Sequence, residues 1–116
     1  SYTLIDTKGK QVGKSVWDDV DAFNADMIAA VMKDGKGGFI DADGKVVVDY
    51  QYEMAQSFAN GMAAVMVGEK WGYIGAEDFG MKIQPAFNAA RDFSSEGTTF
   101  VIDGERWRLL RIYRLT

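Results

Sequence analysis

The feature that most constrains this chain is an internal repeat of about 35 residues. The tetrapeptide Ala-Ala-Val-Met occupies residues 29–32 and returns at residues 63–66. Two aromatic columns keep a spacing of 35 residues through three copies: Phe23, Phe58 and Phe93, and Trp17, Tyr52 and Phe87. Aromatic residues make up 13% of the chain, so one such column would persist through two further copies by chance with a probability of about 0.02. Repeating units bury the same face by stacking on one another, and we therefore expect a repeat architecture.

We expect the whole chain, residues 1–116, to form a single repeat domain. Its copies span approximately these ranges, the last of which is partial: 2–36, 37–70, 71–106 and 107–116. The third copy has a longer turn at residues 75–80, where the second has residues 41–44. Insertions between repeats belong in loops, so this difference is compatible with one shared fold.

Each copy is predicted to contain three strands joined by turns. The short apolar run at residues 62–67 precedes a glycine-containing turn and the β-prone residues 71–74, which indicates a β-hairpin. Gly44 supplies the positive φ that a second turn needs. We therefore predict an all-β fold in which antiparallel β-hairpins stack as a short open array or meander. A closed propeller is not expected, because propellers typically have four or more blades.

A helix is the alternative for one region of the first copy. Five apolar residues there are spaced three or four apart, as in an amphipathic helix: Val16, Val20, Phe23, Met27 and Val31. The equivalent stretch of the second copy is interrupted by Gly61, and that of the third by the polar residues 94–97. If the copies share one fold, these interruptions favour loop and strand over helix.

The segment Glu-Lys-Trp-Gly-Tyr-Ile at residues 69–74 resembles the WG-repeat family of bacteria, which is named for a Trp-Gly pair. The second copy follows that family's pattern at these positions: Lys36, residues 38–41, Gly44, residues 45–48, Tyr52, Phe58 and residues 61–65. The sequence departs from the pattern at Gly37, which stands where Trp is expected, and at Arg108, which follows Trp107 in place of Gly. The resemblance implies a β-rich, non-catalytic array of a kind often found in envelope-associated or secreted proteins.

Composition argues against most catalysis, because the chain has no histidine and no cysteine. Three serines are candidate nucleophiles, but a Ser-His-Asp triad is impossible and we expect structural roles for them: Ser57, Ser94 and Ser95. Two groups of acids are candidates for the carboxylate pair of a glycosidase: Asp18, Asp19 and Asp21, or Glu77 and Asp78. Because these acids lie in loop-like polar stretches, we expect them to be solvated surface residues.

Two short motifs are better explained as turns than as ligand sites. Residues 41–44 (Asp-Ala-Asp-Gly) lack one ligand and the spacing of a calcium-binding loop. Residues 35–38 (Gly-Lys-Gly-Gly) lack the GxxxxGK[ST] pattern of a phosphate-binding loop. The sequence therefore predicts no metal, no cofactor and no catalytic residue, and it identifies no specific contact residue.

The aromatic residues allow two interpretations. The three tryptophans and five tyrosines would form a sugar-binding platform if they were exposed, or would pack the core between stacked units. Their recurrence in the repeat favours core packing, and Tyr50 and Trp107 are the least regular cases.

Residues 106–114 combine cations with aromatics. They would either contact an anionic surface or form a final strand whose arginines protect its edge. We favour the strand.

The leading functional hypothesis is a non-enzymatic repeat module that mediates protein or cell-envelope interaction. The alternatives are a carbohydrate-binding module that uses exposed aromatics, and a carboxylate-based hydrolase.

The net charge is −4, and residues 1–105 carry −8 because four arginines follow Glu105. This acidic body opposes nucleic-acid binding. No apolar run approaches a membrane span, and a homo-oligomer through edge strands is a further hypothesis. The chain begins at Ser1, so we expect a mature form or a piece of a longer protein, with an extracytoplasmic location favoured.

Overall fold

The computed structural model describes residues 1–112, and these residues form only strands, turns and loops. The all-β prediction is confirmed. The helical alternative is wrong, because residues 21–27 form a loop between strands. Within this range no helix is long and apolar enough to cross a membrane.

The strands are β1 (Tyr2–Ile5), β2 (Gln11–Trp17), β3 (Asp19–Val20), β4 (Ile28–Lys33), β5 (Lys36–Asp41), β6 (Val46–Tyr52), β7 (Met54–Ala55), β8 (Met62–Val67), β9 (Lys70–Gly75), β10 (Met81–Phe87), β11 (Ala89–Ala90), β12 (Thr98–Asp103) and β13 (Arg106–Arg111).

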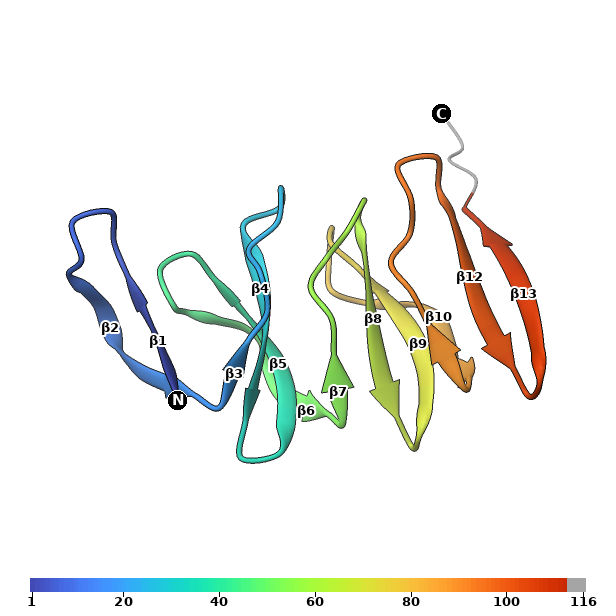
Figure 1. Cartoon of the computed structure of the whole chain (residues 1–116), viewed down its shortest axis with the longest axis horizontal. Coiled ribbons are helices and arrows are strands. Elements are labelled where there is room, and N and C mark those ends of the chain that lie inside the picture. Colours follow the sequence, from blue (N-terminus) through green and yellow to red (C-terminus); the bar gives the residue numbers. More distant parts are fainter. Residues whose placement is uncertain (113–116) are drawn as a thin grey trace.

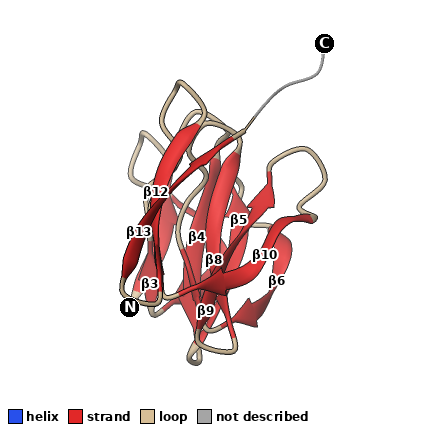
Figure 2. Cartoon of the chain, turned by 90° about the vertical axis from the view of Figure 1, so that its right-hand side faces the viewer, coloured by secondary structure: helices blue, strands red, loops and turns tan. Residues whose placement is uncertain are grey.

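Over residues 1–112 the strands form antiparallel sheets in the order β1-β2, β3-β4-β5-β6, β7-β8-β9-β10 and β11-β12-β13. The sheets follow one another along the long axis of the molecule, from the N-terminal hairpin to β13 (Figure 1). Viewed from the C-terminal end, β4, β8 and β12 run in similar directions (Figure 2). The described chain measures 45 × 33 × 19 Å, which is the elongated shape of an open stack and not of a closed ring.

The sheets do not coincide with the sequence repeats. Each inner sheet takes its first two strands from one copy and its last two from the next; β3 and β4 end the first copy, and β5 and β6 begin the second. Each copy also contains a two-residue strand that was not predicted, for example β7, which follows β6 after the single residue Glu53. The chain therefore bends at Glu53 and passes directly from one sheet to the next.

A repeated hydrogen bond fixes this bend. Residues 18, 53 and 88 occupy the same position in successive copies, and their side chains accept a hydrogen bond from a hairpin turn of the sheet that the chain is entering. The three bonds are Asp34 N–H to Asp18 Oδ2 (2.8 Å), Gly68 N–H to Glu53 Oε1 (2.5 Å) and Gly104 N–H to Asn88 Oδ1 (2.7 Å). An oxygen acceptor is the shared requirement, so the identity of the residue varies between Asp, Glu and Asn.

The core lies between the sheets, and the central strands contribute to it from both faces. In β8, Ala63 and Val65 belong to the cluster shared with the preceding sheet, whereas Ala64 belongs to the cluster shared with the following sheet. All three side chains are fully buried. Successive side chains of a strand point to opposite faces, so a strand covered on both sides requires a continuous apolar run. This requirement explains why the apolar tetrapeptide is repeated.

The phenylalanine column occupies equivalent sites in successive interfaces. Phe58 packs on Phe39 with ring centroids 5.1 Å apart, and Phe93 packs on Tyr73 at 4.8 Å. Phe23 is half-buried and packs on the cluster around Trp17, between the first two sheets. Stacking of units on a shared aromatic site is therefore confirmed.

The glycine of the Trp-Gly pair lets the fourth strand of a sheet pass close to the third. Tyr73 pairs with Ile83 and Trp71 with Phe87, so residues 84–86 bulge opposite the single residue Gly72. A Cβ atom on Gly72 would lie 2.5 Å from the carbonyl oxygen of Ile83. The preceding sheet repeats the arrangement, because a Cβ on Gly38 would lie 2.7 Å from the carbonyl oxygen of Val48.

We predict that Gly72→Ala lowers the free energy of unfolding by about 1–3 kcal/mol, because the added methyl group collides with the backbone of the bulge. Gly75→Ala is the matched control on the same strand. Its Cβ would meet only the flexible side chain of Lys82, and we expect a smaller loss. Chemical denaturation of both variants tests this, and equal losses would contradict the proposed role of Gly72.

Candidate functional site

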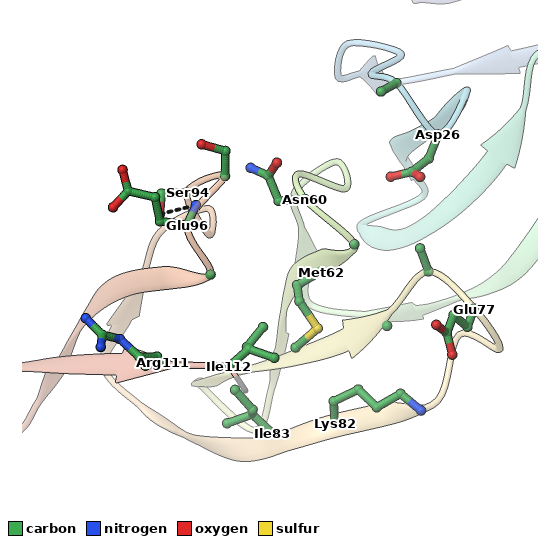
Figure 3. A pocket seen from close by; sticks show the side chains of 16 residues that line it. Asp26, Asn60, Met62, Glu77, Lys82, Ile83, Ser94, Glu96, Arg111 and Ile112 are labelled. Carbon is green, nitrogen blue, oxygen red and sulfur yellow. Dashed lines mark hydrogen bonds between the residues drawn. The ribbon is translucent and has the colours of Figure 1, made fainter. Parts of the chain in front are cut away.

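A groove of about 1110 Å³ runs along the edge of the stack where the loops of all three copies gather. We call it the loop groove (Figure 3). Its walls come from the loop before β4, the loop before β8, the turn between β9 and β10, and the loop before β12. The lining residues are Ala25, Asp26, Asn60, Gly61, Met62, Gly75, Ala76, Glu77, Lys82, Ile83, Ser94, Ser95, Glu96, Gly97, Arg111 and Ile112.

Hydrogen bonds between copies hold the loops in place. The Asn24 side chain donates from Nδ2 to the carbonyl oxygen of Phe58 at 2.6 Å, and Asn60 donates in the same way to Phe93 at 2.7 Å. Each bond links the loop of one copy to the aromatic anchor of the next. The sequence pattern did not reveal this pair, because Asn24 and Asn60 are 36 residues apart and so lie one position out of step with the phenylalanine column.

The longer turn of the third copy forms one wall of the groove. Its Phe79 reaches back to the preceding interface and packs on Phe58, with ring centroids 5.9 Å apart. Gly80 donates its N–H to Asp78 Oδ1 at 2.9 Å. The insertion is a loop, as predicted, and its Glu77 lines the groove.

The groove has an apolar centre between two charged ends. Met62, Ile83 and Ile112 lie in the middle, while Glu77 and Lys82 lie toward one end (Figure 3). At the other end are Glu96 and Arg111, which are likewise shown in that view.

One cation of the groove is already neutralised by an adjacent acid. Lys82 Nζ lies 3.1 Å from Asp78 Oδ1. The pKa of Asp78 is held below its ordinary value, first by the Gly80 N–H and then by Lys82. Because Asp26 and Glu77 line the same end of the groove, that end is left acidic.

Asp18, Asp19 and Asp21, one of the two candidate groups of hydrolytic acids, each accept separate backbone hydrogen bonds. Asp18 caps a turn, as described above, and Asp19 accepts from the Val20 N–H at 3.0 Å. Asp21 accepts from the backbone N–H of Ala22 and of Ser57. Over residues 1–112 no group of three or more acids is placed to hold a metal ion.

The three candidate nucleophilic serines have different surroundings. Ser57 is buried, and its hydroxyl oxygen accepts from the Ala30 N–H at 2.9 Å. The hydroxyl of Ser94 shares a hydrogen bond with that of Thr98 at 2.9 Å. Ser95 lines the loop groove. Structural roles are therefore visible for Ser57 and Ser94.

The two short motifs that are predicted to be turns, residues 41–44 and 35–38, differ in their backbone structure. Asp41 Oδ1 accepts from the N–H groups of Asp43 and Lys45, each at 2.9 Å, which is the pattern of a side-chain-stabilised turn. Residues 41–44 are thus a turn, as predicted. In the other motif only Gly35 lies in a turn, with φ of 80°. The turn prediction is wrong for Lys36, Gly37 and Gly38, which begin strand β5 because they pair with β4.

The tryptophans divide between the core and the surface. Trp17 and Trp71 are buried, and Trp17 Nε1 donates to Tyr50 Oη of the next copy at 2.8 Å. Core packing is therefore confirmed for these two. Trp107 is 57% exposed on the outer face of the last sheet, where Phe100 meets it edge-on at 6.4 Å and Arg91 lies 5.4 Å from its ring centroid.

The arginine-rich segment forms the final strand β13, as predicted. Arg108 pairs with Asp103 of the neighbouring strand at 2.9 Å. Arg114, the last arginine of this segment, lies outside the described residues.

Residues 2–36, 38–71 and 71–107 match the family described as WG containing repeat. Stacked antiparallel hairpins define a β-repeat protein. Because the three matches together cover nearly the whole sequence, the chain belongs to the WG containing repeat family. No curated protein and no solved structure matches the chain significantly.

Asp92, in the loop before β12, has a raised pKa because of burial and a charge from another copy. The pKa of Asp92 is raised above its ordinary value, chiefly by desolvation and further by the charge of Asp21. A raised folded-state pKa means that the folded chain binds this proton more tightly than the unfolded chain. The ionised Asp92 therefore destabilises the fold at pH values above its folded pKa, and the penalty disappears below the ordinary aspartate pKa.

We predict that Asp92→Asn raises Tm at about pH 7 and leaves it nearly unchanged at about pH 3, where the carboxyl is protonated in both states. Thermal melts across this range measure the difference. Asp43→Asn, in an exposed turn, controls for the loss of one negative charge. A stabilisation by Asp92→Asn that persists at the acidic end would contradict this account.

Proposed function

We propose that this domain is a non-enzymatic binding module that holds an extended segment of a partner protein in the loop groove. The main support for the proposal is that loops of three successive copies form the walls of the groove. Repeat arrays characteristically bind through surfaces that extend over several units. The partner in this proposal is a protein or a cell-envelope component, and the envelope part rests on the family resemblance alone.

The groove chemistry suits an apolar side chain flanked by charged ones. Met62, Ile83 and Ile112 offer an apolar centre. Asp26 and Glu77 make one end acidic, because Lys82 is paired with Asp78. We therefore expect the bound segment to place an apolar side chain centrally and a basic one toward Glu77. Complementary charges at a rim act mainly on specificity and association rate.

A binding role is also favoured by the sequence. Histidine and cysteine are missing from the entire chain, which removes the commonest general base and the thiolate nucleophile. The acids of residues 18–21 are engaged in backbone hydrogen bonds, which is a structural use of these side chains.

The proposal predicts that immobilised domain selects peptides with an apolar residue next to a basic one from a displayed peptide library. Glu77→Lys should weaken binding of the selected peptide by about fivefold to tenfold, because one rim charge pair becomes repulsive. Glu69→Lys, in a hairpin turn on the opposite edge, is the matched control and should have no effect. Failure to enrich any peptide, or equal losses in the two variants, would refute the groove as the binding site.

A carbohydrate-binding module is the second candidate, because Phe100 and Trp107 are both about half exposed on one sheet face. Their rings are inclined by 83°, so a single flat sugar ring would stack on one of them and not on both. Glycan-array binding that is lost in Trp107→Ala and retained in Glu77→Lys would favour this candidate over the peptide-binding proposal.

A further inference from the structure

The loop before β8 ends in a tight turn that contains an Asn-Gly pair. Ala59 and Met62 pair across this turn through two backbone hydrogen bonds of 2.9 and 3.2 Å. Asn60 and Gly61 are its two central residues, with φ values of 54° and 86°. A two-residue turn with positive φ at both central positions favours Asn-Gly. The turn geometry therefore explains the pair, which also has a chemistry of its own.

An asparagine that is followed by glycine is the least hindered case for deamidation. The backbone nitrogen of Gly61, after it loses its proton to hydroxide, would attack Cγ of the Asn60 side chain. The Cγ–Nδ2 bond then breaks, Nδ2 takes a proton from water and leaves as ammonia, and a five-membered cyclic imide remains. Water opens this ring at either carbonyl and leaves aspartate or isoaspartate at position 60. A side chain on the following residue would crowd the attacking nitrogen, and glycine has none.

The structure leaves both reacting groups accessible to solvent. Asn60 is exposed, and a Cβ atom built on Gly61 would have no atom beyond its chain neighbours within 4 Å. Among the backbone hydrogen bonds of residues 1–112, none is donated by the Gly61 N–H. Hydroxide can therefore reach this proton, and no backbone acceptor has to release it first.

The chain contains two matched comparisons, because each of its other asparagines is followed by alanine: Asn24 and Asn88. Asn24 is half-buried and makes the same hydrogen bond between copies as Asn60. Asn88 is exposed, as Asn60 is. The methyl group of the following alanine hinders attack at both positions, so Asn60 alone among the three combines exposure with an unhindered nitrogen.

We infer that Asn60 is a modification site, at which the folded chain deamidates spontaneously and so loses a hydrogen bond that joins its second copy to its third. Asn60 donates this bond from Nδ2 to the carbonyl oxygen of Phe93 at 2.7 Å, and Nδ2 is the atom that leaves. A carboxylate only accepts hydrogen bonds, so the bond does not re-form in either product. Because the reaction consumes the bond, the folded chain should react up to about tenfold more slowly than a free peptide of the same sequence.

Deamidation changes one wall of the loop groove, which both Asn60 and Gly61 line. Figure 3 shows the Asn60 amide facing the loop that carries Ser94 and Glu96. The product adds a negative charge on this side, where Glu96 already supplies one. Isoaspartate also adds one main-chain carbon to a turn of only two residues. The hydrogen bonds between Ala59 and Met62 then no longer span the turn for which Asn-Gly is suited.

Peptide mapping by mass spectrometry measures the reaction in the folded chain at mildly alkaline pH. Asn60 should convert roughly tenfold faster than Asn24 or Asn88, which corresponds to a barrier lower by about 1.4 kcal/mol. Conversion should slow at mildly acidic pH, because hydroxide is scarce there. In Ala25→Gly, Asn24 should become reactive as well. The proposal is overturned if Asn60 stays intact while a synthetic peptide of residues 56–66 is fully converted. Equal rates at Asn60 and Asn88, or an unreactive Asn24 in Ala25→Gly, would also overturn it.

Thermal melts measure the structural consequence. Asn60→Asp, which lacks the donor, should lower Tm by about 4 °C, and the deamidated chain isolated by ion exchange should also melt below the unmodified chain. Asn88→Asp is the matched control, because Asn88 accepts its bond from Gly104 through an oxygen, as Asp18 and Glu53 do at the equivalent positions. It adds the same charge and should leave Tm nearly unchanged. Equal melting of the two variants, or of the deamidated and unmodified chains, would refute the loss of the bond between copies. Neither measurement needs a groove partner, so both keep their meaning if peptide binding fails.

Discussion

Burial of the central strands from both faces is the constraint on which the rest of the structure depends. Strands β4 and β8 send alternate side chains into two different clusters, so neither sheet of a neighbouring pair can lose its partner without exposing apolar surface. A two-stranded hairpin is marginal alone, and the four-stranded sheets have apolar side chains on both faces that need covering, so stacking supplies the missing burial. The repeated alanines keep the strand faces small where the large rings Phe58 and Phe93 enter from the neighbouring sheet.

The same constraint determines where the candidate surfaces lie. Because each copy donates strands to two sheets, the loops of all copies emerge along one edge, where the asparagine bonds from Asn24 and Asn60 fix their spacing. The loop groove is a consequence of that regular spacing. Over residues 1–112, the outer face of the sheet β11-β12-β13 differs from the inner faces, because its Phe100, Trp107 and Leu109 are exposed.

The sequence was sufficient to predict the repeat, the all-β class and the shared environment of the phenylalanine column, because side-chain periodicity directly reflects burial. It did not reveal the two-residue strands or the sheet boundaries, since the bend at Glu53 is set by a hydrogen bond that Asp, Glu and Asn satisfy equally well. Nor could it locate the groove. Its lining comes from residues far apart in the chain, and the packing of Phe79 on Phe58 depends on how the longer turn folds back.

The most direct measurement is the free energy of unfolding after truncation of each phenylalanine to alanine, at a concentration low enough to exclude association. Phe58 and Phe93 are 0% and 2% exposed, Phe23 is half-buried, and Phe100 is 52% exposed. Stacking predicts losses of about 3–5 kcal/mol for Phe58→Ala and Phe93→Ala. A smaller loss is expected for Phe23→Ala, and one within about 0.5 kcal/mol of zero for Phe100→Ala. Similar losses at Phe58 and Phe100 would contradict the stacked arrangement.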